Sequence, residues 1–227
     1  IAIACGIRYS FTDESFFAEN AVKYLLAFSI TYIPIGNPIT EEVFYKFVAV
    51  YDLVKDTMTA PQKAQIDTFL TTLFTTAQAF IAARPAVLSH SNFESSNLLL
   101  MTAIAYTLDD SAKKTVSQAL YESQIGLNIL AAGTIETSIP YAVGSVPAEM
   151  LDDPVELGAT FDKYHRDSIG YHCASVAGLI EAAAVAKNNG GSWQTYTTGG
   201  KILNDAVAFA LLYANGTRTH TEFVNSL

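Results

Sequence analysis

The chain has 227 residues, of which 50% are hydrophobic and only 15% are charged, so it is a compact, core-rich protein and not a disordered one. Its 13 lysines and arginines stand against 22 aspartates and glutamates, and the net charge of −9 lacks the basic footprint of a nucleic-acid-binding protein. No uninterrupted apolar run reaches the roughly 18 residues that cross a bilayer, so we expect no membrane-spanning segment and no membrane partner.

Helical periodicity dominates the chain from its first residues onward. Apolar residues recur at three- and four-residue intervals, most regularly from Ile66 to Ile81. Thr12, Thr40 and Thr59 precede three of the helical segments as candidate N-caps. The pattern predicts helices at 1–10, 13–31, 41–57, 60–83, 93–108, 111–131, 168–187 and 200–214.

The predicted helices are of two kinds. Segments 13–31 and 60–83 are amphipathic, whereas Leu98–Ala105 and Cys173–Ala186 are apolar on almost every side and must be covered on every side. This alternation predicts an all-α protein with two concentric layers, an incomplete (α/α) toroid of antiparallel helical hairpins. An ordinary helical bundle or an α-solenoid is the alternative.

Other features of the sequence concern processing and redox state. The chain opens on Ile1 within a helical pattern, and we expect a single domain over residues 1–227 that lacks an N-terminal portion. Two cysteines are too few for a disulfide framework, and Cys173 is expected to be buried because it lies in an apolar run. The sequon at Asn215 is compatible with secretion.

Two polar clusters precede the two apolar helices. The loop 84–92 leads into the cluster Ser89–Asn97, and the segment 133–167, which shows no helical period, ends in the cluster Asp162–His172. A loop as long as 133–167 in a compact domain is usually functional. Because both clusters lie at helix N-termini, we expect them to converge at one end of the barrel.

Simpler roles compete for these residues. Helix capping explains part of the first cluster, with Ser91 or Asn92 as the N-cap and Glu94 reaching back. Arg166 and Asp167 are also compatible with a solvated surface pair. Sequence motifs for a metal site, a phosphate-binding loop or a serine hydrolase are absent. Glu94, Asp162 and Asp167 are the candidate carboxylates of a glycoside hydrolase, which is one alternative function.

Several stretches together resemble the alginate lyase family, whose members are polysaccharide lyases on an (α/α) toroid. The stretches are residues 2–28, Val50–Leu53, Ser91–Ser96 with Ala103–Ala105, and His165–His172 followed by Gly178–Ala183. The last of these is similar to the Arg-Asp-Ser-x-x-Tyr-His element that precedes an inner helix in the family.

The resemblance implies roles for individual residues. Tyr171 matches the tyrosine that serves as base or acid, Asn92 the asparagine that contacts the uronate carboxylate, and Arg166 the arginine that neutralises it. His172 completes the expected catalytic set. The expected substrate-binding residues are His90, Glu94, Tyr164 and His165. One position departs from the family, because Phe93 stands where many members have a histidine that can take the proton.

The expected activity is therefore β-elimination on a uronate-containing acidic polysaccharide by a secreted or periplasmic lyase. The carboxylate-binding donors would stabilise the developing enolate, and a tyrosine near cations can exchange the proton, so neither a metal nor an organic cofactor is required. The alternative to a lyase or a glycoside hydrolase is a non-catalytic toroid that binds a glycan or a protein partner.

Overall fold

The computed structural model describes residues 1–85, 90–131, 157–165 and 168–219. Its elements in chain order are α1 (Ala2–Thr12), α2 (Ser15–Thr31), α3 (Pro38–Glu41), α4 (Phe44–Val54), η1 (Lys55–Thr57), α5 (Ala60–Ala83), α6 (Asn92–Thr107), α7 (Ser111–Leu127), α9 (Phe161–His165), α10 (Ser168–Asn188), η3 (Trp193–Thr195) and α11 (Leu203–Ala214). Within these ranges, extended pairing is limited to two isolated β-bridges, Ile129 with Thr160 and Thr198 with Lys201.

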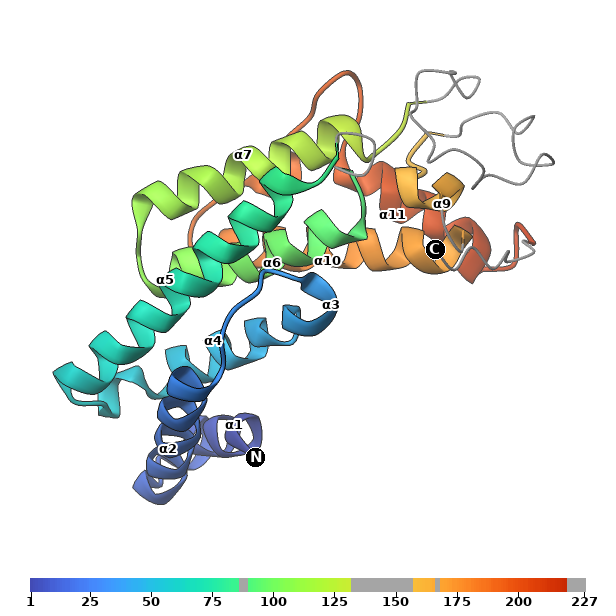
Figure 1. The fold of residues 1–227 in the computed structure, drawn as a ribbon. Coiled ribbons are helices and arrows are strands. Elements are labelled where there is room, and N and C mark those ends of the chain that lie inside the picture. Colours follow the sequence, from blue (N-terminus) through green and yellow to red (C-terminus); the bar gives the residue numbers. More distant parts are fainter. Residues whose placement is uncertain (86–89, 132–156, 166–167, 220–227) are drawn as a thin grey trace.

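The long helices alternate between two layers (Figure 1). The inner row runs through α1, α4, α6 and α10, each of which packs against the next. The outer helices α2, α5, α7 and α11 pack against this row. In the chain, each outer helix is the next long helix after an inner one. This arrangement confirms the all-α, two-layer architecture expected from the alternation of apolar and amphipathic segments.

The two apolar helices differ in how completely they are covered. Every residue of α6 from Glu94 to Ala105 is buried, because α4, α5, α7 and α10 surround it. Helix α10 buries residues such as Leu179 and Ala183 but exposes a stripe that includes Cys173, Ile180 and Glu181. The expectation that Cys173 is buried is therefore wrong, since its face of α10 has no covering helix in the described part of the chain.

Element boundaries mostly follow the sequence pattern. Thr59 caps α5 through a reciprocal capping box with Gln62, as expected. Thr12 and Thr40 are not N-caps: Glu14 precedes α2, and Asn37 caps the short helix α3. The expected helix 41–57 is divided into the end of α3, α4 and η1, and the segment 133–167 contains the short helix α9.

A buried carboxylate holds the connection between α2 and α3. Both oxygens of Glu41 are bonded, Oε1 to the hydroxyl of Tyr32 (2.9 Å) and the N–H of Ile35 (2.6 Å), and Oε2 to the N–H of Gly36 (2.8 Å). The Gly36 carbonyl accepts a hydrogen bond from Nδ2 of Asn97, in the middle of α6 (3.1 Å). The connection is thereby fixed against α6.

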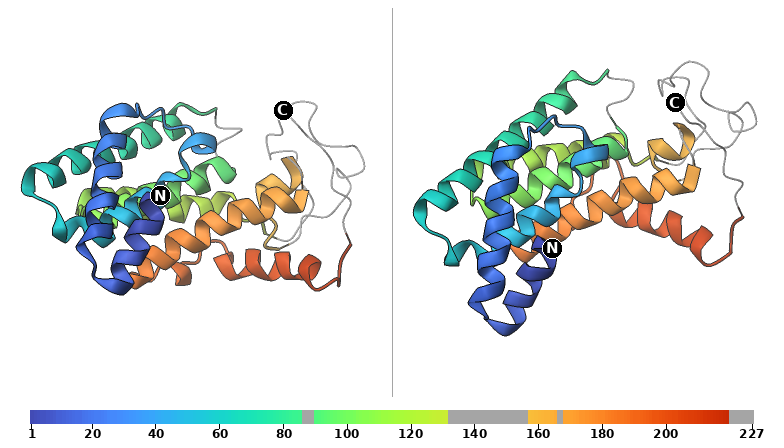
Figure 2. Two further views of the ribbon diagram at one scale, coloured as in Figure 1. Left: turned by 90° about the horizontal axis from the view of Figure 1, so that it is seen from below. Right: turned by 60° about the horizontal axis from the view of Figure 1, so that its bottom comes forward.

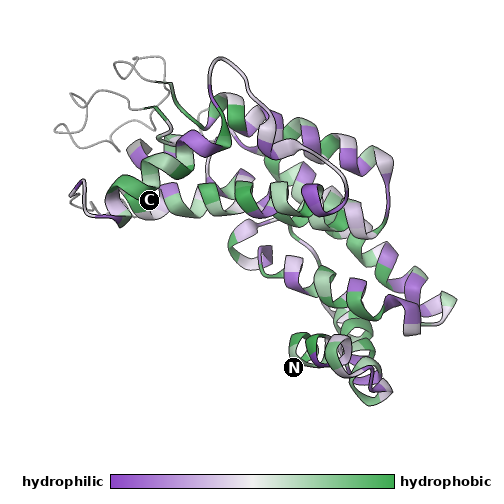
Figure 3. Ribbon diagram, turned by 180° about the vertical axis from the view of Figure 1, so that it is seen from behind, coloured by the Kyte–Doolittle hydropathy of each residue, from purple (hydrophilic) through white to green (hydrophobic). Residues whose placement is uncertain are grey.

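The α1–α2 pair projects from the rest of the molecule (Figures 1 and 2). Large apolar side chains are exposed on it, among them Ile7, Phe11 and Phe16, and both helices are predominantly hydrophobic in Figure 3. No helix that the structure describes covers these side chains.

Candidate active site

The first turn of α6 is held by a reciprocal capping box. Ser91 is the N-cap, and its hydroxyl accepts a hydrogen bond from the N–H of Phe93 (3.3 Å). Oε2 of Glu94 accepts from the N–H of Ser91 (2.9 Å) and from its hydroxyl (2.7 Å). The capping role considered for Ser91 and Glu94 from the sequence is thus present, and it satisfies backbone donors that the helix itself leaves unpaired.

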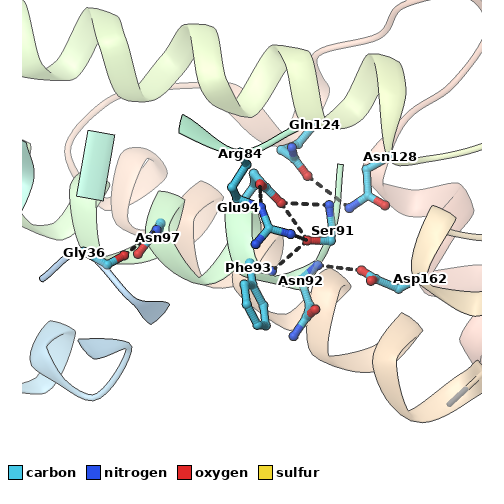
Figure 4. Close-up of polar contacts among 10 residues, drawn as sticks. All are labelled: Gly36, Arg84, Ser91, Asn92, Phe93, Glu94, Asn97, Gln124, Asn128 and Asp162. Carbon is cyan, nitrogen blue, oxygen red and sulfur yellow. Dashed lines mark hydrogen bonds and ion pairs between the residues drawn. The ribbon is translucent and has the colours of Figure 1, made fainter. Parts of the chain in front are cut away.

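Arg84 lies against this turn. Its Nε is 2.7 Å from Oε1 of Glu94, and the guanidinium carbon lies 4.7 Å from the centre of the Phe93 ring (Figure 4). Burial raises the pKa of the fully buried Glu94 carboxyl, and the Arg84 charge and the Ser91 hydrogen bonds oppose that rise. In this arrangement Glu94 caps the start of α6 and forms the ion pair with Arg84, and its side chain has no exposed surface for a substrate to contact.

Asn92 is the first residue of α6 and is bonded through its backbone. Its N–H donates to Oδ2 of Asp162 at 2.5 Å, a contact between residues 70 positions apart in the chain. The side-chain Oδ1 is buried and has no hydrogen-bond partner among the described residues. In Figure 4 the Asn92 amide and the Phe93 ring point to the same side, away from Glu94 and from α7.

The two candidate residues at the start of α10 have different surroundings. Tyr171 is half-buried in the first turn of the helix. His172 is fully buried: Nδ1 lies 3.2 Å from the N–H and 3.1 Å from the hydroxyl of Thr160, and Nε2 lies 3.1 Å from the Ala206 carbonyl. Burial lowers the pKa of His172 to about 4. Its ring meets that of Phe209 edge-on, with centroids 5.0 Å apart.

The bonds of His172 assign it a structural role in this structure. The Thr160 N–H requires a lone pair on Nδ1, so the neutral ring carries its proton on Nε2 and donates it to the Ala206 carbonyl. Both ring nitrogens are therefore occupied within the core. The catalytic role expected for His172 would require it to leave these partners, and we place it outside the proposed catalytic set.

Helices α6 and α10 run side by side in the same direction. Their N-terminal ends share the contact between the Ser95 and Ser175 hydroxyls (3.1 Å). Their C-terminal ends line one pocket, α6 through Ala103, Tyr106 and Thr107, and α10 through Val185 and Asn188. Gly178 permits the close approach, since a Cβ there would lie 2.7 Å from the Ser95 carbonyl oxygen. Asn92 and Tyr171 each lie about one turn before the serine contact, so they are at the same level of adjacent helices.

The remaining predicted site residues are located only in part. His90 is half-buried just before α6, and burial lowers its pKa. Tyr164 and His165 lie on α9, and their side chains are outside the described part of the structure. Arg166 also lies outside the described residues. In the described ranges no group of three His, Cys, Asp or Glu side chains is placed to hold a metal ion.

Sequence reasoning missed several contacts in and around the two polar clusters. Asn128 accepts a hydrogen bond from the Phe161 N–H through Oδ1 (3.1 Å) and donates from Nδ2 to Ser175 (2.7 Å). Asp162 bonds the Asn92 N–H instead of acting as the expected glycosidase carboxylate, and Arg84 pairs with Glu94, a contact that the sequence analysis did not predict. The Asp162 and Asn128 contacts join segments that are distant in sequence, so no local pattern marks them.

The inner row of helices and the outer helices that pack against it define the chain as an (α/α) toroid protein. It belongs to the alginate lyase family, whose model matches residues 2–220.

Two solved structures of alginate lyase A1-III are similar in fold. One is a variant complexed with a tetrasaccharide, and it is 13% identical with a TM-score of 0.62 over 95% of this chain and 58% of that one. The other is the enzyme from Sphingomonas species A1, also 13% identical with a TM-score of 0.62, over 95% of this chain and 57% of that one. The chain thus spans a little over half the length of these relatives. A comparison with curated proteins found no match.

Among the residues that the structure describes, two helices are long and apolar enough, by length and composition alone, to cross a membrane: α5, and α10 from Ile169 to Asn188. Core helices of globular proteins meet the same criterion, and α10 packs against α6, α9 and α11. The composition of these helices is therefore weak evidence for a membrane span.

Proposed function

We propose that the chain is part of a polysaccharide lyase that cleaves a uronate-containing acidic polysaccharide by β-elimination. One observation carries the proposal within this family: Asn92 and Tyr171 lie at the same level of two adjacent parallel inner helices, where the Asp162 bond and the serine contact hold the helix ends together. In the sequence these residues belong to two separate clusters.

The chemistry assigns each residue a task. Tyr171 takes the proton from C5 of the uronate and returns a proton to the departing 4-linked oxygen, so that the C4–O bond breaks as the double bond forms. The amide of Asn92 donates to the uronate carboxylate and stabilises the enolate that develops next to it. Arg166 is proposed as the neutralising cation, and His90 as a substrate contact beside Asn92. Tyr164 and His165 remain proposed as substrate-binding residues.

Of the two alternatives, the glycoside hydrolase fits the described residues less well than the lyase does. A glycoside hydrolase needs two carboxyl groups that face each other across an open site. Glu94 and Asp162 are both fully buried, and each is bonded at the start of α6, while the third candidate, Asp167, lies outside the described residues. A non-catalytic glycan-binding toroid is favoured by one feature, the Phe93 ring stacked under Arg84 where many family members have a histidine. Cleavage of a polymer distinguishes the lyase from the glycan-binding toroid, which would bind the polymer without cleaving it.

The test is an assay of the ultraviolet absorbance that the conjugated double bond of the product produces. We expect activity on at least one polymer in a panel of alginate, glucuronan and other polyuronates. Tyr171→Phe should lower kcat at least about 100-fold, the usual contribution of a general acid–base group. Tyr24→Phe, at an exposed tyrosine of α2, is the matched control and should leave kcat unchanged.

The outcomes decide between the functions. A folded wild-type chain that is inactive on every polymer would contradict the lyase proposal for this chain, and binding without cleavage would favour the glycan-binding toroid. A fully active Tyr171→Phe variant would remove Tyr171 from the mechanism. We further propose a secreted or periplasmic location, which suits an enzyme whose substrate is a polymer outside the cytoplasm.

A further inference from the structure

A short segment before α10 contacts the ends of three helices. Thr160 bonds His172 of α10, Phe161 bonds Asn128 at the end of α7, and Asp162 bonds Asn92 at the start of α6. Gly158 and Ala159 complete the segment through backbone hydrogen bonds with Leu130 (3.0 and 2.8 Å). Residues 158–162 therefore link the first turn of α6 to the first turn of α10.

Within residues 158–162, Asp162 is the residue that bonds to a proposed catalytic residue, Asn92. Its side chain is fully buried, and its carboxylate receives the N–H of the first residue of a 16-residue helix. That N–H has no acceptor within the helix, and the positive end of the helix dipole favours a negative charge there. A bond from an N–H to a carboxylate is stronger than one to a neutral acceptor.

The capping box does not replace this bond. The Ser91 hydroxyl accepts from Phe93, and Glu94 accepts from Ser91. The N–H of Asn92 has its acceptor in Asp162, so the direction of the Asn92 backbone depends on that carboxylate.

We propose that Asp162 is a positioning residue that fixes Asn92 relative to Tyr171. The inference rests on the proposed function, because the consequence of the bond is the placement of the Asn92 amide beside the reacting uronate. Asp162 acts through the Asn92 backbone and does not touch the substrate. Its loss displaces an enolate-stabilising donor, which slows the chemical step more than it weakens substrate binding.

The experiment compares substitutions at Asp162 on the responding polymer. Asp162→Ala should lower kcat about 30- to 100-fold with KM changed less than about threefold, since a displacement of about 1 Å at a catalytic group can cost about 100-fold in rate. Asp162→Asn keeps an acceptor oxygen without the charge and should lower kcat about three- to tenfold, since a neutral hydrogen bond is roughly half as strong. The rescue by asparagine distinguishes positioning from a general loss of structure.

Asp110 offers a matched control at the opposite end of α6. It is the N-cap of α7, where its Oδ1 accepts from the Lys113 N–H (3.0 Å) and its Oδ2 contacts the Lys113 ammonium. Asp110→Asn removes the charge of a helix-terminal carboxylate far from the site. Its kcat and KM should equal those of the wild type.

A second readout does not depend on activity. Amide hydrogen exchange in the first turn of α6 should be faster in Asp162→Asn than in the wild type, and unchanged in Asp110→Asn. Unchanged exchange in Asp162→Asn, or an active wild type whose kcat does not fall in that variant, would overturn the proposal even if Asp162→Ala does not fold. A larger effect on KM than on kcat would also overturn it. If the wild type is inactive but exchange becomes faster, the lyase function fails while the contact that holds Asn92 stands.

Discussion

Acidification should weaken the folded state through His172. Burial lowers the pKa of this histidine to about 4, whereas the same side chain in an unfolded chain has a pKa of about 6.5. The main cause is that the ring is shielded from water; the hydrogen bond to the Ala206 carbonyl opposes the shift, and the ammonium of Lys163 adds a small unfavourable charge. A proton on Nδ1 would remove the Thr160 bond.

The sign and size of the effect follow from proton linkage. Above pH 6.5 the histidine is neutral in both states, and its contribution to stability is fully present. As the pH falls below 6.5 the unfolded chain takes up a proton that the folded chain refuses until the pH approaches 4, so stability is lost. Between pH 7.5 and pH 5 this difference amounts to about 2 kcal/mol for His172.

Urea unfolding at pH 7.5, 6 and 5 measures this loss. His172→Gln removes the titrating group. Between pH 7.5 and pH 5 the unfolding free energy of this variant should therefore fall by about 2 kcal/mol less than that of the wild type. At pH 7.5 the variant is less stable than the wild type, because the buried hydrogen bonds of His172 are lost. His90 and the carboxylates titrate in both proteins, and their contributions cancel in the comparison. An equal pH dependence in the two proteins would refute the reasoning, as would a His172 imidazole resonance that titrates near pH 6.5 in the folded wild type.

Three further substitutions, the last of them a control, are tested by urea unfolding at pH 7.5. Glu94→Ala leaves the half-buried Arg84 without its carboxylate and should cost about 3 kcal/mol, whereas a loss below about 1 kcal/mol would show that the ion pair is dispensable. Gly36→Ala should cost more than about 2 kcal/mol, because φ is +76° and a Cβ would lie 2.3 Å from the Thr76 carbonyl oxygen. Gly200→Ala, with φ at +75° but open space around it, should cost only about 1 kcal/mol, and equal losses at the two glycines would contradict the steric argument.

The sequence alone determined the helices and their alternation. A repeat of three and four residues is a local property, so it located α5 and α6 closely, and the threonine before α5 marked its start. The same pattern placed Tyr171 in the first turn of one apolar helix and Asn92 directly before another, and the structure has both residues in first turns, with α6 beginning one residue earlier than predicted. The resemblance of short motifs also identified the family, which the match over residues 2–220 confirms.

Only the tertiary structure decided which side chains face one another. The Asp162–Asn92 bond joins residues 70 positions apart, and the Ser95–Ser175 contact joins residues 80 apart, so no local pattern encodes either. The role of His172 likewise depends on the Ala206 carbonyl of a different helix. An apolar helix pattern shows that burial is possible, but which stripe is covered depends on the neighbouring helices, and for this reason Glu94 is enclosed whereas Cys173 is exposed.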